Sequence, residues 1–350
     1  MGVIQVPKDS ENFFKKKIDN IFKSGNLAEN FWNDQLRGLV NKITGSKGSE
    51  IFCSNGAGLL TILQIYKKYY GRKEILIQNN TMYGMYTMAN SSGLKLKGYI
   101  ECNLETLMPS FNDFIKALKD SKTKNNELVV MLSHMGGIIN PDIKRIANYC
   151  KKKNIKLLED CAHSFGATID KKHSGMFGDA GVYSFYATKS IPAGEGGILV
   201  SNDEKLISLA QRYVKYDRFE QKMSIGVNFR ISEIQALLIF SVIKNYKKII
   251  NDKRKTYKIY EKFCKKNKIK FIDQYKRGNG NHYKFTIINK KQKITDYLKK
   301  LKTKTSEIYD YSLNGDMYIP DHHVCLPIWY KQKKNIINRA IDEIKKSLNV

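Results

Sequence analysis

Short apolar segments alternate with helical patterns in the first half of the chain, and this alternation constrains the fold most strongly. Residues 127–134 (ELVVMLSH) and 155–160 (IKLLED) are typical of buried strands, and residues 141–154 between them carry apolar side chains at helical spacing. A strand–helix–strand rhythm predicts a parallel sheet covered by helices. Ligands of such sheets bind at the carboxyl ends of the strands, where His134 and Asp160 stand.

The sequence pattern changes after about residue 244. A long lysine- and tyrosine-rich helical segment begins there, and it is followed by two short strand-like segments (268–272 and 282–288) and a terminal helix (334–348). Two further buried strands are expected at 74–78 and 180–186. We therefore expect a large α/β domain over residues 1–243 and a smaller α+β domain over residues 244–350, with an N-terminal helix that packs toward the smaller domain.

The charge balance favours a small anionic substrate over a nucleic acid. The chain has 61 Lys and Arg residues against 33 Asp and Glu residues, a formal net charge of +28. The lysines are spread along the chain and arginine is sparse, although bidentate phosphate and guanine contacts favour arginine. We expect no nucleic-acid partner, although the charge leaves a nucleic-acid binder as an alternative, and we expect a basic entrance to a small-molecule site.

The six cysteines lack CxxC spacing, and they are typical of buried thiols in a cytosolic protein rather than of disulfides or metal ligands. No apolar run reaches the length of a membrane span, and the N-terminus lacks the apolar core of a signal peptide. His322 and His323 are adjacent and so point apart, and no further ligand is evident near them. We expect a cytoplasmic protein without a metal or a membrane contact.

Lys189 stands alone between the strand-like GVYSFY and a glycine cluster, in the stretch SFYATKSIPAGEGG. A solvated lysine needs no such setting, whereas a lysine that acts as an amine nucleophile must be held rigidly against its electrophile. Asp160 precedes it by 29 residues, enough for a loop, a strand and a turn back to the same sheet edge. A carboxylate at Asp160 could hold a pyridinium nitrogen protonated, and a structural or helix-capping role is the alternative.

A third element completes the pattern. SNGAGLLTILQIYKKYY (54–70) is a small-residue turn that opens a long helix, and free backbone N–H groups at Asn55, Gly56 and Ala57 could bind a phosphate there. A plain helix start is the alternative for this segment alone. Together, the turn, Asp160 and Lys189 indicate a pyridoxal-phosphate site.

The chain resembles the DegT/DnrJ/EryC1/StrS family of nucleotide-sugar aminotransferases. EDCAHSFGA, GDAGVYSFYATKSIPAGEGGILVSND and GVNFRISEIQALL match its signature blocks in order and spacing. SGNLAENFWNDQLRGLV resembles its N-terminal block and VCLPIW its C-terminal block. The resemblance implies an aspartate aminotransferase-like fold (pyridoxal-phosphate fold type I), with a large, mostly parallel sheet domain and a smaller C-terminal α+β domain.

The resemblance also implies roles for individual residues. Lys189 would form the Schiff base with pyridoxal 5′-phosphate, Asp160 would pair with the pyridine nitrogen, and His163 replaces the glutamine that the family has near the ring hydroxyl. Ala57 replaces a hydroxyl residue, so only its backbone could contribute. The other expected cofactor contacts are the phosphate ligands Gly56 and Ser184, a ring-stacking residue at Met82 or Tyr83, and Asn228 from the partner subunit of a homodimer. A local helix cap is the alternative role for Asn228.

The resemblance favours transamination over dehydration, because Lys189 is retained where histidine replaces it in the dehydratase branch. The implied reaction is C4 amination of a nucleotide-linked 4-keto-6-deoxyhexose with L-glutamate as amino donor, for glycan biosynthesis. C3 amination of a 3-keto sugar is the first alternative. A pyridoxal-phosphate enzyme of amino-acid metabolism stays open as a second, because fold does not fix substrate.

Overall fold

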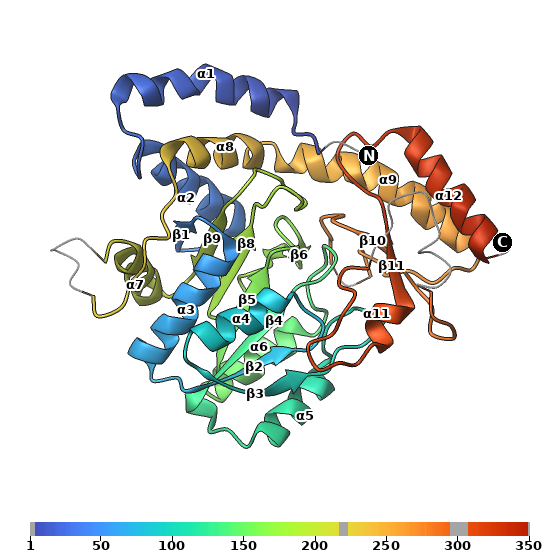
Figure 1. Ribbon diagram of the computed structural model, residues 1–350, viewed down its shortest axis with the longest axis horizontal. Helices are drawn as coiled ribbons and strands as arrows, with labels where there is room; N and C mark the ends of the chain where they lie inside the picture. Colours follow the sequence, from blue (N-terminus) through green and yellow to red (C-terminus); the bar gives the residue numbers. More distant parts are fainter. Residues whose placement is uncertain (1–3, 217–222, 277, 295–306, 349–350) are drawn as a thin grey trace.

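Seven strands form one twisted sheet at the centre of the molecule (Figure 1). The computed structural model describes residues 4–216, 223–276, 278–294 and 307–348. In spatial order, the strands are β1 (Gly48–Phe52), β9 (Gly197–Ser201), β8 (Ala180–Ser184), β5 (Lys156–Cys161), β4 (Leu128–Ser133), β2 (Glu74–Gln78) and β3 (Lys95–Ile100). The five strands from β8 to β3 pair in parallel, and β9 alone runs antiparallel to its neighbours. The mostly parallel sheet is confirmed.

Helices cover both faces of this sheet, which explains its continuous apolar strands. In β4, Val129 and Met131 belong to the core on one face of the sheet, together with residues of α3 and α4, while Val130 and Leu132 belong to the core on the other face, together with residues of α5 and α6. The helices that pack around the sheet are α2 (Phe31–Thr44), α3 (Asn55–Tyr70), α4 (Tyr83–Ser91), α5 (Phe111–Ser121), α6 (Ile143–Lys152), α7 (Glu204–Val214) and α8 (Glu233–Ile243). A short 3-10 turn, η1 (Asn125–Glu127), precedes β4, and β6 (Thr168–Ile169) pairs with β7 (Lys172–His173) beyond the sheet.

The N-terminal helix α1 (Lys8–Ser24) lies along α8 (Figure 1). Phe13 packs edge-on against Trp32 of α2, with ring centroids 5.9 Å apart, and lies 5.8 Å from the ring of Phe240 in α8. The first turn of α1 also contacts the helix that begins at Tyr246, through a 2.7 Å ion pair between Asp9 and Lys248.

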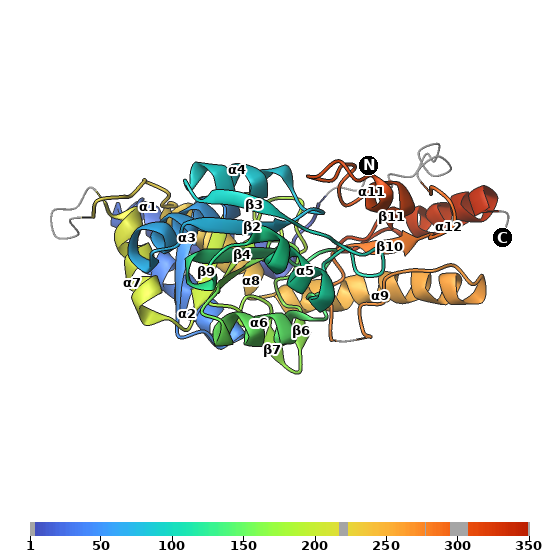
Figure 2. The same ribbon diagram turned by 90° about the horizontal axis from the view of Figure 1, so that it is seen from below.

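The C-terminal part builds a second core around a long helix, α9 (Tyr246–Lys266), which extends away from the sheet (Figure 2). Its other elements are β10 (Phe285–Ile288), β11 (His323–Leu326), α11 (Tyr318–His322) and α12 (Lys334–Leu348). β10 and β11 pair antiparallel. We keep the division of the chain between residues 243 and 244 as a proposal. The outermost residues of both proposed domains, 1–3 and 349–350, lie outside the described part.

Two strand predictions in this part need correction. The segment 268–272 is not a strand: Lys268 has a φ of +55° and only Phe271 makes a bridge, to Ile287. The strand predicted from residue 282 begins at Phe285, because His282 has a φ of +54°, which interrupts an extended chain. Tyr283 and Lys284 instead contact the loop after β4, where the Lys284 backbone N–H donates a 3.1 Å hydrogen bond to the Gly136 carbonyl.

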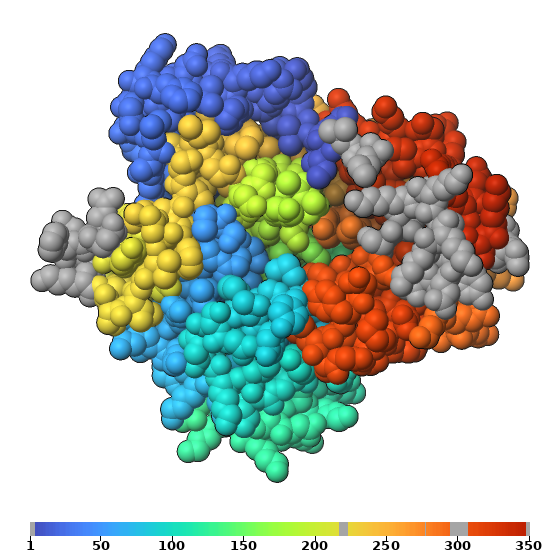
Figure 3. All heavy atoms as spheres, in the orientation of Figure 1, coloured from blue at the N-terminus to red at the C-terminus, as the bar shows by residue number. Residues whose placement is uncertain are grey.

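Several contacts join the C-terminal part to the carboxyl edge of the sheet, and two of them show how closely the parts approach. After β4, Gly137 has a φ of +100°, and a Cβ there would lie 2.7 Å from the backbone nitrogen of Tyr283, so only glycine allows this approach. In the second contact, the Tyr311 hydroxyl of the C-terminal part accepts a 2.7 Å hydrogen bond from the backbone N–H of Tyr83 in α4. In Figure 3, the orange-red C-terminal segment adjoins the teal segment around α4.

Within the described residues, no helix has both the length and the apolar character that crossing a bilayer requires.

Candidate active site

Asp160 lies at the carboxyl edge of the sheet, directly beside Ser133 in the parallel register of β4 and β5. Its carboxylate accepts hydrogen bonds from the Ser133 hydroxyl (2.9 Å), the Asn55 side-chain amide (3.2 Å) and the backbone N–H of Ala162 (3.1 Å). The Ser133 hydroxyl also lies 2.7 Å from that of Thr81. These contacts fix the orientation of a buried carboxylate at the edge where parallel sheets bind ligands.

His163 lies one turn beyond Asp160 and is buried. Its ring lies 4.6 Å from that of Tyr283 and 6.1 Å from that of Tyr309, between centroids. Its Nδ1 is buried and has no hydrogen-bond partner among the described residues. Burial, together with the charges of Lys189 and Lys284, holds the pKa of His163 well below its usual value, so the imidazole is neutral at pH 7. A neutral ring with an unpartnered nitrogen can bond a ligand hydroxyl.

Lys189 follows β8 in a turn closed by a 2.9 Å hydrogen bond from its backbone N–H to the carbonyl of Tyr186. Its Nζ lies 5.8 Å from the centroid of the Tyr283 ring, on the side of the sheet where His163 lies. The side chain is half-buried, and within the described ranges no carboxylate forms an ion pair with it. The amine is therefore held near His163 without an ion-pair partner among the described residues.

The segment predicted to bind a phosphate opens α3, and one of its N–H groups already has a partner. Ser54 caps α3, and its hydroxyl accepts the backbone N–H of Ala57 at 3.1 Å, so the Ala57 N–H is not free as predicted. A hydroxyl side chain at the N-cap satisfies such a group locally. Gly56 occupies the second position of α3, where the helix offers its N–H no acceptor. Ser184 ends β8, is buried and accepts a 3.4 Å hydrogen bond from the Tyr186 N–H.

Met82 and Tyr83 lie at the start of α4, with 41% and 59% of their surface exposed. Thr81, which precedes them, joins the Asp160 network through Ser133, so the chain passes close to the site at this point. Which of the two side chains stacks on a ligand remains a prediction. Asn228 is exposed, and its side-chain oxygen accepts a 3.4 Å hydrogen bond from the Arg230 N–H.

Sequence reasoning missed several residues that complete this site. Ser133 ends a strand that was predicted, so the pairing of strand ends could have identified it. Tyr283 and Tyr309 carried no such local signal, since each is more than 90 residues from Lys189 and belongs to the C-terminal part. Asn281 anchors this part, because its side-chain amide donates to the carbonyl oxygens of His163 (2.9 Å) and Phe165 (3.0 Å).

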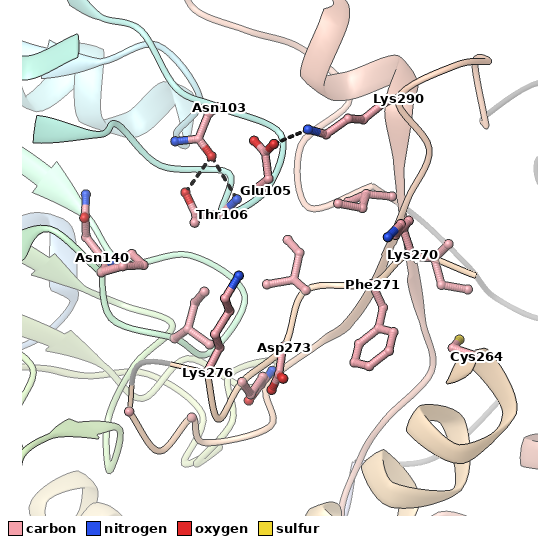
Figure 4. A pocket seen from close by; sticks show the side chains of 18 of the residues that line it. Asn103, Glu105, Thr106, Asn140, Cys264, Lys270, Phe271, Asp273, Lys276 and Lys290 are labelled. Carbon is pink, nitrogen blue, oxygen red and sulfur yellow. Dashed lines mark hydrogen bonds and ion pairs between the residues drawn. The ribbon is translucent and has the colours of Figure 1, made fainter. Parts of the chain in front are cut away.

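A cavity of about 1520 Å³ lies between the loops of the sheet and the C-terminal part, but it is not the site described above. Figure 4 shows residues of both parts around it, among them Asn140 and Lys276, and an ion pair between Glu105 and Lys290. None of the predicted site residues lines it. We place the chemistry at Asp160 and Lys189, because buried polar groups converge there.

One buried group has metal-ligand chemistry: His134, Glu159 and Cys161 lie with their donor atoms within 4.8 Å of one another. The His134 Nε2 and a Glu159 oxygen are 2.8 Å apart, and Glu159 also accepts backbone N–H groups from Gly175 and Phe177. These hydrogen bonds already occupy the His134 nitrogen and the Glu159 oxygens that could bind a metal. The group therefore has a structural function: it fixes the loop before β8.

The large, mostly parallel sheet with helices on both faces is that of pyridoxal-phosphate fold type I. A solved structure of Helicobacter pylori PseC, an aminotransferase involved in the biosynthesis of pseudoaminic acid, matches with a TM-score of 0.83 over 96% of each chain, at 20% identity. The model of the DegT/DnrJ/EryC1/StrS aminotransferase family matches residues 8–339, and the chain belongs to this family. The family depends on pyridoxal phosphate in general.

Two curated relatives give the range of activities among similar proteins. The chain is 29% identical to the GDP-perosamine synthase of Escherichia coli O157:H7 over 50% of this chain and 49% of the relative. It is 25% identical to the UDP-4-amino-4,6-dideoxy-N-acetyl-beta-L-altrosamine transaminase of H. pylori, over 72% of this chain and 67% of the relative. The match thus spans between half and two thirds of these relatives.

Proposed function

We propose that this protein is a pyridoxal-phosphate-dependent aminotransferase that transfers an amino group from L-glutamate to C4 of a nucleotide-linked 4-keto-6-deoxyhexose. The observation that carries the proposal is the convergence of Lys189, Asp160 and His163 at one edge of the sheet. The names of the two curated relatives support a nucleotide-linked amino sugar as product.

The residues present fit the cofactor. The buried Nδ1 of His163 lacks a partner among the described residues and suits a ring hydroxyl, because a neutral imidazole can accept its hydrogen bond. Asp160 is an oriented carboxylate suited to a pyridinium N–H. When bound, pyridoxal phosphate supplies an aldehyde that carries the amino group and a ring that accepts electrons.

The remaining roles belong to side chains near these groups. Lys189 would hold the cofactor covalently and, once released, move a proton as general base and acid. We propose Gly56 and Ser184 as phosphate ligands at the positive end of the α3 dipole. Ala57 would take part only if its N–H exchanged the Ser54 hydroxyl for the phosphate. Met82 or Tyr83 would cover the ring face.

We further propose a homodimer in which Asn228 completes the neighbouring site. Asn228 is exposed, as are the apolar side chains next to two proposed site residues: Tyr186 near Lys189 is 45% exposed and Val227 beside Asn228 is 40% exposed. Exposed apolar side chains around a binding site suit an interface between subunits.

An assay of the purified, cofactor-loaded protein tests the proposal. It would receive L-glutamate with a panel of guanosine-, uridine- and thymidine-linked sugars that carry the keto group at C4 or at C3, and the product would be identified by mass and by NMR. We expect amination at C4, and none by Lys189→Ala protein. Amination at C3 would correct the position, whereas reaction with keto acids alone would favour amino-acid metabolism instead.

A further inference from the structure

Three lysine amines surround the ring of Tyr283. The Nζ atoms of Lys189, Lys253 and Lys284 lie 5.8, 5.8 and 5.2 Å from its centroid. They come from three separate places: the turn after β8, the helix α9 and the residue before β10. We call Lys253, Lys284 and Tyr283 the lysine cluster. Like charges that converge on one point raise the energy of the folded protein, so the arrangement needs an explanation.

Nothing in the described ranges neutralises this cluster. No carboxylate there forms an ion pair with Lys253 or Lys284, although both ion pairs and lysines are common on this protein. Lys253 is only 3% exposed, and the one hydrogen bond that its amine donates goes to the Ser190 hydroxyl, at 3.2 Å. An ammonium has three donors, so two are unused at a buried position.

The electrostatics are those of a site that favours an anion. Burial, helped by the charge of Lys284, lowers the pKa of Lys253 to about 7. The charge of Lys284 also lowers the pKa of His163, whose buried Nδ1 has no described partner. A buried ammonium with unused donors and no counter-charge is costly, and a bound anion removes much of that cost.

The position of the cluster indicates which anion it takes. Its lysines belong to α9 and to the segment before β10, whereas the proposed phosphate ligands Gly56 and Ser184 belong to α3 and β8. The cluster instead lies beside His163, on the side proposed for the ring hydroxyl. An amino donor must bring its amine to the place of the Lys189 Nζ, and its carboxylates would then lie within reach of the Tyr283 ring.

We propose that Lys253 and Lys284 bind the carboxylates of a dicarboxylic amino donor, an inference that rests on the proposed function. When Lys189 is bonded to the cofactor, the ammonium groups of Lys253 and Lys284 remain. The two carboxylates of the donor match these two positive charges. A donor with an amide in place of the second carboxylate leaves one ammonium unpaired. The cluster therefore selects L-glutamate over L-glutamine, which has nearly the same shape and one charge less.

The direct test is binding of an unreactive dicarboxylate. Calorimetric titration of the cofactor-loaded protein with glutarate would compare wild type with Lys284→Gln and Lys253→Met, and Lys291→Gln serves as the control, since Lys291 is exposed after β10. We expect glutarate to bind about 10- to 100-fold more weakly to the two cluster variants than to wild type, because each variant loses a hydrogen bond to a charged group. The control variant should bind glutarate as tightly as wild type. Lys284→Arg should retain binding because it keeps a cation.

A second measurement follows the donor half-reaction by the change in cofactor absorbance. Wild type should react faster with L-glutamate than with L-glutamine, and Lys284→Gln should lose most of this preference while its affinity for a nucleoside diphosphate stays the same. Unchanged glutarate affinity in both cluster variants overturns the inference, and so does a loss of nucleoside-diphosphate affinity, which would assign the cluster to the sugar's phosphates. A wild type that binds glutarate but aminates no keto-sugar would contradict the proposed function and leave the anion site standing.

Discussion

Ser133 donates a 2.9 Å hydrogen bond to Asp160 across the parallel strands β4 and β5, and the Thr81 hydroxyl lies 2.7 Å from the same serine. The Asn55 side-chain amide donates a hydrogen bond to the other carboxylate oxygen of Asp160. Three segments separated by more than 20 residues thus orient one buried carboxylate. This arrangement leads to the first prediction.

Asp160→Asn should keep the cofactor and lose activity by about 10²- to 10⁴-fold, the range typical of lost proton control. An amide cannot hold a pyridinium proton, although it fills the same space. Transamination rates and cofactor absorbance would be measured together. Ser133→Ala is the companion variant: it removes one of the three donors and should cost only about tenfold. Wild-type rates in Asp160→Asn would assign the aspartate a structural role.

Lys189→Ala should abolish transamination, with a loss of at least about 10³-fold, because covalent attachment and proton transfer are both removed. The circular dichroism spectrum should not change, since Lys189 lies in a turn and forms no ion pair within the described part. Lys262→Ala, an exposed substitution on α9, is the control and should be fully active. Substantial turnover by Lys189→Ala would exclude it as the Schiff-base residue.

Mixing two inactive variants tests the dimer. Asn228→Asp places a carboxylate near the proposed phosphate site, where like charges repel. If Asn228 acts in the partner's site, mixed dimers of Lys189→Ala and Asn228→Asp contain one site with both native residues, and activity should return in part. Rates would be measured after the subunits are exchanged at low concentration and reassembled. Mixed dimers without activity would place Asn228 in its own subunit's site or outside both sites.

The buried amine of Lys253 should make stability depend on pH. Its pKa is about 7 in the fold and 10.5 for an ordinary lysine, so the unfolded chain binds more protons between these values. The free energy of unfolding should then rise with pH, by up to about 1.4 kcal/mol per unit from this group. Lys253→Met should be more stable than wild type near pH 7, and this advantage should shrink as pH rises toward 10.

Chemical denaturation of the cofactor-free protein at pH 7, 8 and 9 measures this difference. Lys262→Met, on the exposed side of the same helix, controls for the change in helix composition. Parallel pH dependences for wild type and Lys253→Met would show that Lys253 keeps an ordinary pKa.

Glu233 joins two segments that lie 200 residues apart. Its carboxylate accepts the backbone N–H groups of Asn30 (2.8 Å), Trp32 (2.7 Å) and Asn33 (3.0 Å) at the start of α2. Glu233→Gln should lower the free energy of unfolding by about 1–3 kcal/mol, because an amide replaces a buried charged acceptor. The control is Glu204→Gln, whose partner Lys47 is exposed, and it should change stability by less than about 1 kcal/mol.

The sequence alone determined the features that depend on short-range pattern. Burial of both faces of the sheet produced the continuous apolar runs of β2, β4, β5 and β8, and cap residues marked the start of α3, so these elements were predicted to within a few residues. Asp160 and Lys189 were predicted because parallel strands bring their carboxyl ends to one edge. The strand predicted over residues 282–288 was misplaced at its start, because His282 has a positive φ that the apolar pattern does not indicate.

Only the tertiary structure decided which further groups meet at this edge. Among 61 lysine and arginine residues, nothing local distinguishes Lys253 from the exposed lysines of the same helix, α9. Its amine is buried because α9 packs against the segment that ends in β10, and the path of that segment depends on the contact of Tyr283 with Gly137. Burial and convergence arise from long-range packing, so pKa shifts and charge clusters cannot be read from spacing along the chain.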